Sequence, residues 1–287
     1  MNSMWDVFSE HLDNSYIRQP GDSDVEEGAP QANEEIPFEK KDFRKKLMLS
    51  VWLRTKPPNF EEEWMAKLCP IGKRHLIVAY RKITTSYDKK GVKQETFYSS
   101  FPGGNTNAVN IHVFTVLDCI FDETVKCYFV LDVVAWNNLS FRQVGVEHRY
   151  QWLKSKFDEQ VNGRRIFENN SDTHHTRQFY LIETFPVQDL YSHITCQYFP
   201  VPAEKKYYIR LDGILFFHRL TPYKRGINPF VCWLKPFMVP EVLQLDVAKN
   251  YPPPNNYTGM RNYLQQLRPQ SQKPSKQKNR QGYKPSN

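Results

Sequence analysis

Two adjacent basic residues follow a tight corner in the chain, in the stretch Cys69-Pro-Ile-Gly-Lys-Arg74. Proline fixes the backbone φ angle there, and glycine allows the backbone to come close to another group. The apolar run that follows, Leu76–Tyr80, predicts a buried strand that anchors the corner. Lys73 and Arg74 can therefore face an anion such as a phosphate. A strand with a solvated basic edge is the plainer interpretation of this stretch taken alone.

Three further stretches extend the pattern: Thr115-Val-Leu-Asp-Cys-Ile120, Leu211-Asp-Gly-Ile-Leu-Phe-Phe217 and Trp233-Leu-Lys-Pro236. Their order and spacing after the corner resemble the covalent nucleotidyltransferases, the fold of RNA capping enzymes and polynucleotide ligases. In that family a lysine of a Lys-x-Asp-Gly-x-Arg motif attacks a nucleotide phosphate. The resemblance implies a nucleotide-binding pocket.

The residues that this chemistry needs are missing here. Cys69 stands in the place of the lysine nucleophile, and Ile71 in the place of the aspartate. The next motif, Asp-Gly-Glu in the family, reads Asp118-Cys-Ile120, and Trp233 replaces a lysine of the last motif. Nucleotidyl transfer cannot proceed without its amine nucleophile and metal-binding carboxylates. We therefore expect a pocket with no catalytic residue, no metal and no cofactor.

Mostly β-strands are expected to position these residues. The hydrophobic pattern predicts strands over residues 47–53, 76–80, 114–121, 127–136, 179–185, 207–219 and 229–239. The strands 114–121 and 127–136 are close enough to form a hairpin. Residues 82–93 are expected to be a polar loop, and Pro102–Asn105 a turn that could also cradle a phosphate.

Two helices are expected beside the strands. An apolar stripe at Tyr150, Leu153, Phe157 and Val161 predicts a helix over residues 147–161, and a shorter one is expected over 186–193. The fold class is therefore α+β, with antiparallel β-sheets and flanking helices in one domain, residues 45–250.

Charge is spread unevenly along the 287 residues. The formal net charge is +8, but residues 1–37 hold nine acids and one base, and residues 261–287 hold seven bases and no acid. The middle of the chain carries +9, which favours a polyanionic partner. Residues 1–44 and 251–287 are polar and are expected to be a flexible acidic N-terminal region and a disordered basic tail.

The cysteine and hydropathy patterns argue against disulfide-rich, zinc-binding and membrane-spanning proteins. The five cysteines are odd in number and show no Cys-x-x-Cys spacing, which argues against a disulfide framework or a structural zinc and fits a reduced nuclear or cytosolic compartment. No apolar run reaches the roughly 18 residues of a membrane span. The sequence also lacks a signal peptide. We expect an intracellular protein with no membrane partner.

A more specific set of motifs runs in order through residues 47–245: Leu-Met-Leu-Ser50-x-Trp52-Leu, Cys-Pro-x-Gly-Lys-Arg74, Pro102-Gly-Gly-Asn105, Leu117-Asp-Cys-Ile, Tyr128-x-Val-Leu-Asp-Val, Asp212-Gly-x-Leu-Phe and Trp233-Leu-x-Pro-x-Met-Val239. This set resembles the snurportins, trimethylguanosine-cap receptors that carry small nuclear ribonucleoprotein particles (snRNPs) into the nucleus. Their domain has a nucleotidyltransferase-like fold without the activity. The resemblance implies that Trp233 stacks on the base and Trp52 flanks its methyl groups. It also implies cap contacts from Ser50, Gly72, Lys73, Arg74, Lys89 and Leu234.

The physics of cap binding suits these residue types. Guanine methylated at N7 is positively charged, so an aromatic face gains a cation–π interaction on top of stacking, which is itself worth roughly 1–3 kcal/mol per base. The phosphate bridge favours Arg or Lys. Without the resemblance, a tryptophan in an apolar strand is more often a core residue, and Lys89 in a charged loop is more often solvated.

The two ends of the chain predict transport contacts. Met1, Met4, Phe8 and Leu12 recur at helical spacing and resemble the family's export signal, which docks into an exportin groove. Vertebrate snurportins carry an Arg-rich importin-β-binding helix before the cap domain. Here the region up to Pro37 is acidic, so we expect that helix to be absent. An importin could instead bind residues 40–46 or the basic tail, although the tail could also hold the RNA body.

The expected function is an RNA-cap-binding transport adaptor that recognises the trimethylguanosine cap of U snRNAs, promotes snRNP import and shuttles between nucleus and cytoplasm. Two alternatives stay open. An active GTP- or ATP-dependent nucleotidyltransferase, either an mRNA guanylyltransferase or a ligase, would form a covalent nucleotide adduct. A general RNA-binding module driven by charge would lose affinity steeply with salt and would ignore cap methylation.

Overall fold

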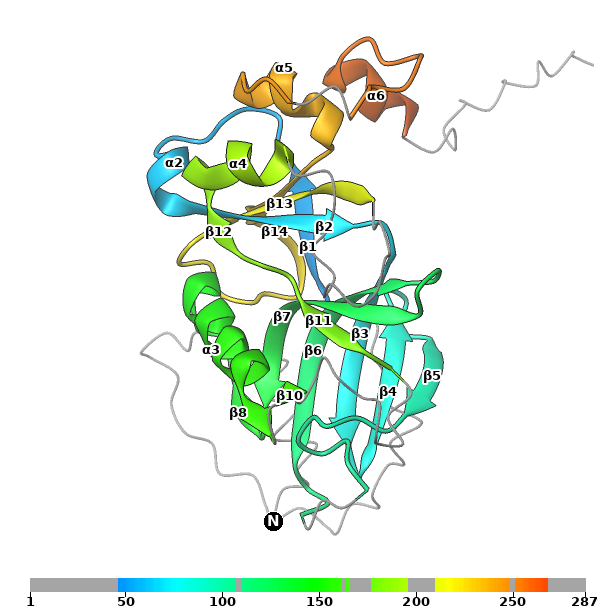
Figure 1. Cartoon of the computed structure of the whole chain (residues 1–287). Helices are drawn as coiled ribbons and strands as arrows, with labels where there is room; N and C mark the ends of the chain where they lie inside the picture. The colour runs from blue at the N-terminus through cyan, green and yellow to red at the C-terminus, as the bar shows by residue number, and fades with distance from the viewer. Residues whose placement is uncertain are drawn as a thin grey trace, which may run out of the picture.

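Two β-sheets form the body of the protein (Figure 1). The computed structural model describes residues 46–106, 110–161, 164–165, 177–195, 210–247 and 251–267. Strand β2 (Trp64–Pro70) belongs to the smaller sheet, and β3 (Lys73–Tyr80) belongs to the larger one. The corner at Ile71-Gly72 therefore links the sheets, as the Pro and Gly residues around it predict.

Seven strands of the described residues form the larger sheet, in the order β11-β7-β6-β3-β4-β5 with β8 paired to β7. Strand β11 joins β7 in parallel, and the other pairs are antiparallel. Besides β3, its strands are β4 (Ile83–Asp88), β5 (Lys93–Phe97), β6 (Phe114–Asp122), β7 (Cys127–Trp136), β8 (Leu139–Ser140) and β11 (Phe179–Leu181). Strands β6 and β7 are buried along almost their whole length, which fits their continuous apolar sequence.

The smaller sheet has the order β1-β14-β13-β2-β12. Its edge strand β1 runs parallel to β14, whereas β13 is antiparallel to both of its neighbours. Besides β2, its strands are β1 (Met48–Trp52), β12 (Phe185–Pro186), β13 (Leu211–His218) and β14 (Gly226–Leu234). A separate antiparallel pair is formed by β9 (Gln160–Val161) and β10 (Arg164–Arg165).

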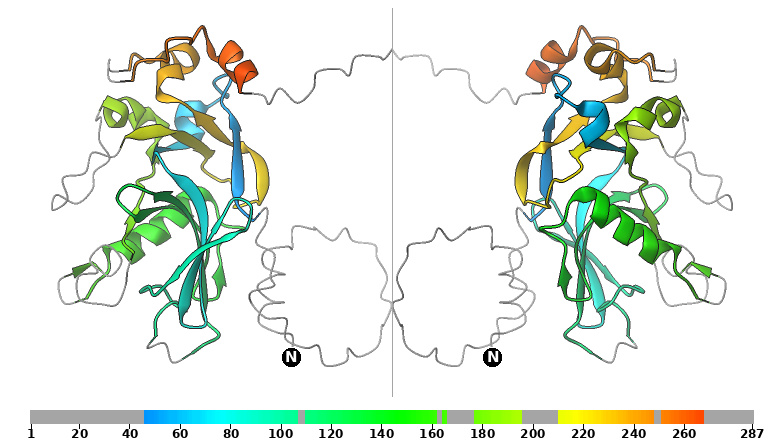
Figure 2. Two further views of the ribbon diagram at one scale, coloured as in Figure 1. Left: turned by 90° about the vertical axis from the view of Figure 1, so that its right-hand side faces the viewer. Right: turned by 90° about the vertical axis from the view of Figure 1, so that its left-hand side faces the viewer.

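Helices cover both sheets. Helix α3 (Val146–Asp158) lies beside the larger sheet and buries the stripe that includes Tyr150, Leu153 and Phe157. Short helices gather at the far end of the smaller sheet, as two views in Figure 2 show: α2 (Phe60–Glu63), η2 (Val187–Asp189), α4 (Leu190–Thr195), η3 (Pro236–Met238), α5 (Val239–Leu243) and α6 (Met260–Gln266).

A shared core holds the sheets together. Cys69, Leu215 and Phe217 of the smaller sheet pack in one buried cluster with residues of β3, β6 and β7. Lys67 on β2 is also buried, and its Nζ donates to the carbonyl oxygen of Leu131 on β7 at 2.6 Å. Burial lowers the pKa of Lys67 to about 8. A buried ammonium needs such a partner, so this bond fixes one sheet against the other.

The structure confirms the α+β class. The hairpin predicted over 114–136 is β6–β7, and the helix predicted over 147–161 is α3. Among the described strands, pairing is antiparallel apart from the β1–β14 and β11–β7 pairs.

The predicted loop at residues 82–93 is wrong in its first half, because Ile83–Asp88 forms β4. Its polar residues do not mark exposure here: Thr84 is fully buried, and its hydroxyl bonds the hydroxyl of Ser99 at 2.6 Å. A hydrogen-bonded hydroxyl can be buried at small cost, so polarity alone misplaced this strand.

The predicted disordered tail is also wrong for residues 251–267. Helix α6 packs on the domain, with Met260 buried and Tyr257 and Tyr263 against the core around the short helices. The carboxylate of Glu241 accepts the Met260 amide at 3.0 and 3.1 Å and the Tyr257 hydroxyl. These apolar and capping contacts offset the cost of ordering a proline- and asparagine-rich segment.

Several predictions fall outside the described residues. These are the export segment Met1–Leu12, most of the basic stretch 40–46 and the tail after Leu267. Within the described ranges, none of the helices has the length and apolar character needed to cross a bilayer.

Candidate functional site

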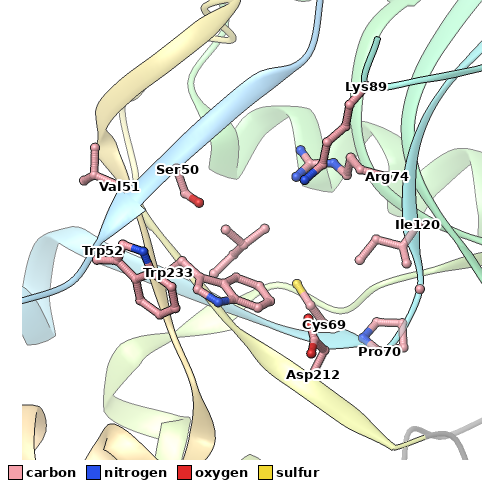
Figure 3. Close-up of a pocket in the computed structure, with 12 residues that line it drawn as sticks. Ser50, Val51, Trp52, Cys69, Pro70, Arg74, Lys89, Ile120, Asp212 and Trp233 are labelled. Atoms are coloured by element: carbon pink, nitrogen blue, oxygen red, sulfur yellow. The ribbon is translucent and has the colours of Figure 1, made fainter. Parts of the chain in front are cut away.

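A pocket of about 330 Å³ lies where the two sheets meet, at the corner between β2 and β3 (Figure 3). A volume of this size is typical of small-molecule sites. Both sheets and the turn between β4 and β5 contribute to its wall, through Ser50, Val51, Trp52, Cys69, Pro70, Gly72, Arg74, Lys89, Ile120, Asp212, Leu215 and Trp233.

Most of the residues predicted to contact a cap lie in this wall. The structure brings together Ser50, Trp52, Gly72, Arg74, Lys89 and Trp233 from β1, the β2–β3 corner, β3, β14 and the β4–β5 turn. Two predicted residues do not line the pocket. Lys73 is exposed and pairs with Glu123 at 2.7 Å, and Leu234 is fully buried in the core on the helix side. Each is next to a lining residue, and neighbouring residues of a strand point to opposite faces.

The two tryptophans are paired by strand register. Trp52 on β1 lies opposite Trp233 on β14, and the Leu53 amide donates to the Trp233 carbonyl at 3.0 Å. Register partners on adjacent strands point to the same face of a sheet, so the two indoles stand beside each other at one end of the pocket (Figure 3). Both are only half-buried. They form an aromatic wall on which a planar base can stack.

Gly213 lets the Trp233 ring take its position. A Cβ atom at Gly213 would lie 2.1 Å from Cζ2 of Trp233 and 2.5 Å from its Cη2. The six-membered ring of the indole therefore covers the backbone of β13 at Gly213, and no larger residue fits beneath it without moving the ring.

Gly213→Ala is expected to displace the Trp233 ring and to weaken binding of any ligand stacked on it by roughly 10-fold, because inserting a methyl group into a filled site costs about 1–3 kcal/mol. Isothermal titration with the ligand and tryptophan fluorescence of the free protein check this. Unchanged affinity together with an unchanged emission spectrum would show that the ring does not depend on Gly213.

Lys89 is held over the other end of the pocket by the turn between β4 and β5. The Asp88 carboxylate shapes this turn: Oδ1 accepts the amides of Lys90 at 2.8 Å and Val92 at 2.9 Å, and Oδ2 accepts the Gln94 side chain at 3.2 Å. These bonds fix the backbone on both sides of Lys89, whose ammonium group stays exposed. Lys89 can therefore meet an anion without reordering its loop.

Arg74 also reaches the pocket, but its charge is already paired. Its Nε and Nη2 contact the two carboxylate oxygens of Asp118 at 2.5 and 2.6 Å. The Tyr223 hydroxyl donates to the same carboxylate at 2.7 Å and accepts the Met48 amide at 3.2 Å. Burial opposes the charged form of Arg74, yet the charge and hydrogen bonds of Asp118 outweigh it, so the pKa of Arg74 is raised above its usual value.

This network connects the two walls of the pocket. Asp118 and Arg74 belong to the larger sheet, whereas Met48 begins β1, which carries Ser50 and Trp52. Arg74 therefore acts first as a brace that positions β1, and an incoming phosphate finds its charge largely neutralised by Asp118.

The floor of the pocket offers no activated nucleophile. Cys69 is fully buried, and burial raises the pKa of its thiol to about 12 although Arg74 and Lys67 oppose this. A neutral thiol is a poor nucleophile. Ile120 lies beside the corner, where a Cβ on Gly72 would be 2.5 Å from its Cγ2. In the described ranges, no three His, Cys, Asp or Glu side chains come together as a metal site.

Some lining residues were not predicted as site residues. They are Val51, Cys69, Pro70, Ile120, Asp212 and Leu215. Period-2 alternation from Gly213 would have found Leu215 on the same face of β13. Asp212 had no such signal, because it occupies an irregular position in the pairing of β13 with β2.

The fold and the pocket together define the class: a two-sheet α+β domain with an aromatic and basic pocket between its sheets. Residues 46–236 match the family model described as "Snurportin1, m3G cap-binding domain". The match covers most of the chain, so this chain belongs to the snurportin cap-binding domain family. The resemblance to snurportins found in the sequence is thereby confirmed.

Solved structures similar to this chain include ligases. The ligase domain of LigD from M. tuberculosis has 9% identity and a TM-score of 0.41, over 66% of this chain and 58% of that one. A mycobacterial DNA ligase D complexed with ATP and MES has 10% identity and a TM-score of 0.40, over 67% of this chain and 60% of that one. This chain thus spans less than two thirds of the length of these ligase chains.

Proposed function

We propose that this protein binds the trimethylguanosine (m3G) cap of U snRNAs in the pocket between the sheets, and acts as an adaptor that promotes snRNP import into the nucleus. The observation that carries the proposal is the pairing of Trp52 and Trp233 at one end of the pocket, with Lys89 at the other end (Figure 3). Membership of a family described by m3G cap binding supports it.

The ligand that fits this arrangement has a flat base at one end and phosphates at the other. The indoles offer stacking and, for a base methylated at N7, a cation–π interaction. Their apolar surface also accepts the dimethylamino group of an m3G base, which has no hydrogen left to donate. Lys89 lies across the pocket from the two indoles (Figure 3), where it can meet the phosphate bridge of a cap stacked on them.

Titration with three cap dinucleotides tests the proposal. We expect m3GpppG to bind more tightly than its 7-monomethylated counterpart, and unmethylated GpppG to bind least. Equal affinity for all three, with a steep dependence on salt, would instead support a general RNA-binding module.

We further propose that the protein has no nucleotidyltransferase activity. The supporting observation is the floor of the pocket, where a neutral, buried Cys69 and the apolar Ile120 take the places of a nucleophile and a carboxylate. Incubation with radiolabelled GTP or ATP and a divalent metal separates the two functions. A protein-bound nucleotide after denaturing electrophoresis would establish the enzyme.

Lys89→Gln is expected to weaken m3GpppG binding by roughly 3- to 10-fold and to reduce the slope of log affinity against log salt by about 0.7, the value for one phosphate contact on a single strand. Lys90→Gln is the matched control, since Lys90 is the adjacent exposed lysine and does not line the pocket. Equal effects of the two substitutions would show that only general charge matters.

Transport requires partners for the two ends of the chain, and the protein is proposed to shuttle between nucleus and cytoplasm. An exportin is proposed to bind the Met1–Leu12 segment, and an importin to bind the basic tail. Because α6 packs on the domain, truncation after Leu267 keeps this helix and removes the basic residues from Arg268 onward. Loss of nuclear entry with unchanged affinity for capped RNA supports the importin contact, whereas lost RNA affinity with normal entry assigns the tail to RNA.

A further inference from the structure

One acidic side chain faces the pocket, beside the aromatic wall. Asp212 is the only carboxylate among the lining residues, in the part of the chain that the structure describes. It precedes Gly213, on which the Trp233 ring rests. A carboxylate in a pocket for a polyphosphate ligand is unfavourable unless the ligand also carries positive charge near it.

A β-bulge directs Asp212 into this position. In the pairing of β13 with β2, Leu211 lies opposite Pro70 and Gly213 lies opposite Cys69, so Asp212 is the extra residue between them. A bulge leaves its extra residue unpaired and re-aims the side chain, and bulges are frequent beside binding sites. Without it, strand alternation would place Asp212 on the face opposite Gly213 and Leu215.

Lys235 holds the carboxylate from outside the pocket wall. Its Nζ lies 2.6 Å from Oδ1 of Asp212 and 5.7 Å from the centroid of the Trp233 ring. In the described part of the chain no donor contacts Oδ2, which remains available to a ligand. The pair is partly open to solvent, with side-chain exposures of 39% for Asp212 and 22% for Lys235. Lys235 therefore orients Asp212 and does not remove it from the pocket.

The pocket consequently has a basic end and an acidic end. Lys89 lies at one end, and Asp212 lies near the tryptophans at the other (Figure 3). Arg74 adds less to this polarity, because two of its nitrogens are held by both oxygens of the buried Asp118, whereas Lys235 engages a single oxygen of the partly exposed Asp212. A ligand with anionic phosphates and a cationic base matches both ends in a single orientation.

Alkylation at N7 gives guanine this charge and makes its N1–H a stronger donor. In a base that also carries two methyl groups on N2, N1–H is the donor left on that edge. We propose that Asp212 is a specificity-determining residue for an N7-alkylated guanine stacked on Trp233. Its carboxylate attracts the positive charge of the base and accepts a hydrogen bond from N1–H. This inference rests on the proposed cap-binding function and concerns how the pocket selects among bases.

The test compares two dinucleotides that differ only at N7. Both carry the N2-dimethyl group, and one also carries the N7 methyl group, so their affinity ratio isolates the response to the base charge. Isothermal titration of the full chain gives this ratio for the unmodified protein, for Asp212→Asn and for Glu123→Gln. The last is a matched control, because Glu123 pairs with Lys73 at 2.7 Å in the same way but does not line the pocket.

We expect the unmodified protein to favour the N7-methylated dinucleotide and Asp212→Asn to reduce this preference about 5- to 20-fold, while Glu123→Gln leaves it unchanged. Asn keeps the shape of the side chain and an acceptor oxygen, so the loss reports charge. Thermal unfolding checks that all three proteins are folded; a variant that unfolds at the titration temperature is replaced by Asp212→Ser, for which the same loss is expected.

Other outcomes separate the failure of this inference from failure of the proposed function. If Asp212→Asn weakens both dinucleotides equally, the residue only positions Trp233 through Lys235, and the inference is wrong. The same holds if the unmodified protein binds both dinucleotides without preference. If the unmodified protein binds neither dinucleotide, the cap-binding function itself is wrong.

Discussion

Trp233→Ala is expected to weaken m3GpppG binding roughly 10- to 100-fold, equivalent to about 1.4–3 kcal/mol of lost stacking and cation–π interaction. The ring lies on the backbone of Gly213 and is only half-buried, with its remaining surface facing the pocket. Removing the ring enlarges the pocket and leaves no cavity in the hydrophobic core, so the domain should stay folded. Titration calorimetry and thermal unfolding measure the two effects separately.

Two variants control this result. Trp233→Phe keeps an aromatic face and should recover part of the affinity. Trp64→Ala removes a tryptophan that is 5% exposed and packs against Phe60; it should lower stability by about 3–5 kcal/mol and leave the affinity of the folded fraction unchanged. If Trp233→Ala instead unfolds the domain while residual binding persists, the ring is a core residue and the aromatic wall is misplaced.

The sequence motifs located the pocket because they are carried by strands that end at it. The corner at residues 69–74 and the stretch beginning at Trp233 are far apart in sequence, yet β13 pairs with both β2 and β14 and so brings them together. The motifs could not show to which face of the sheet each side chain points. Lys73 and Leu234 are neighbours of lining residues but point away, and only the strand register shows this.

The sequence also could not predict which side chains on different strands contact each other. Arg74 was predicted to contact the ligand, and the structure shows that Asp118 occupies its guanidinium group. Asp118 was visible as part of a motif, but its contact depends on the register of β3 with β6. Asp212 depends in the same way on a bulge in the pairing of β13 with β2. Local pattern predicts strands and their apolar faces, whereas bulges and buried ion pairs depend on long-range pairing.

The second large effect is expected at this buried ion pair. Arg74→Met should lower the free energy of unfolding by about 3–5 kcal/mol, because Asp118 is fully buried and would keep its charge without a cationic partner. The double variant Arg74→Met/Asp118→Asn should recover more than half of this loss, since it removes the unpaired charge and still offers Tyr223 an acceptor. Urea denaturation of the wild type, the two single variants and the double variant completes the cycle.

A further readout distinguishes a brace from a phosphate ligand. Because Asp118 neutralises Arg74, the double variant should keep the salt dependence of m3GpppG binding, in contrast to Lys89→Gln. If the double variant instead loses that salt dependence, Arg74 exchanges Asp118 for a phosphate when the cap binds.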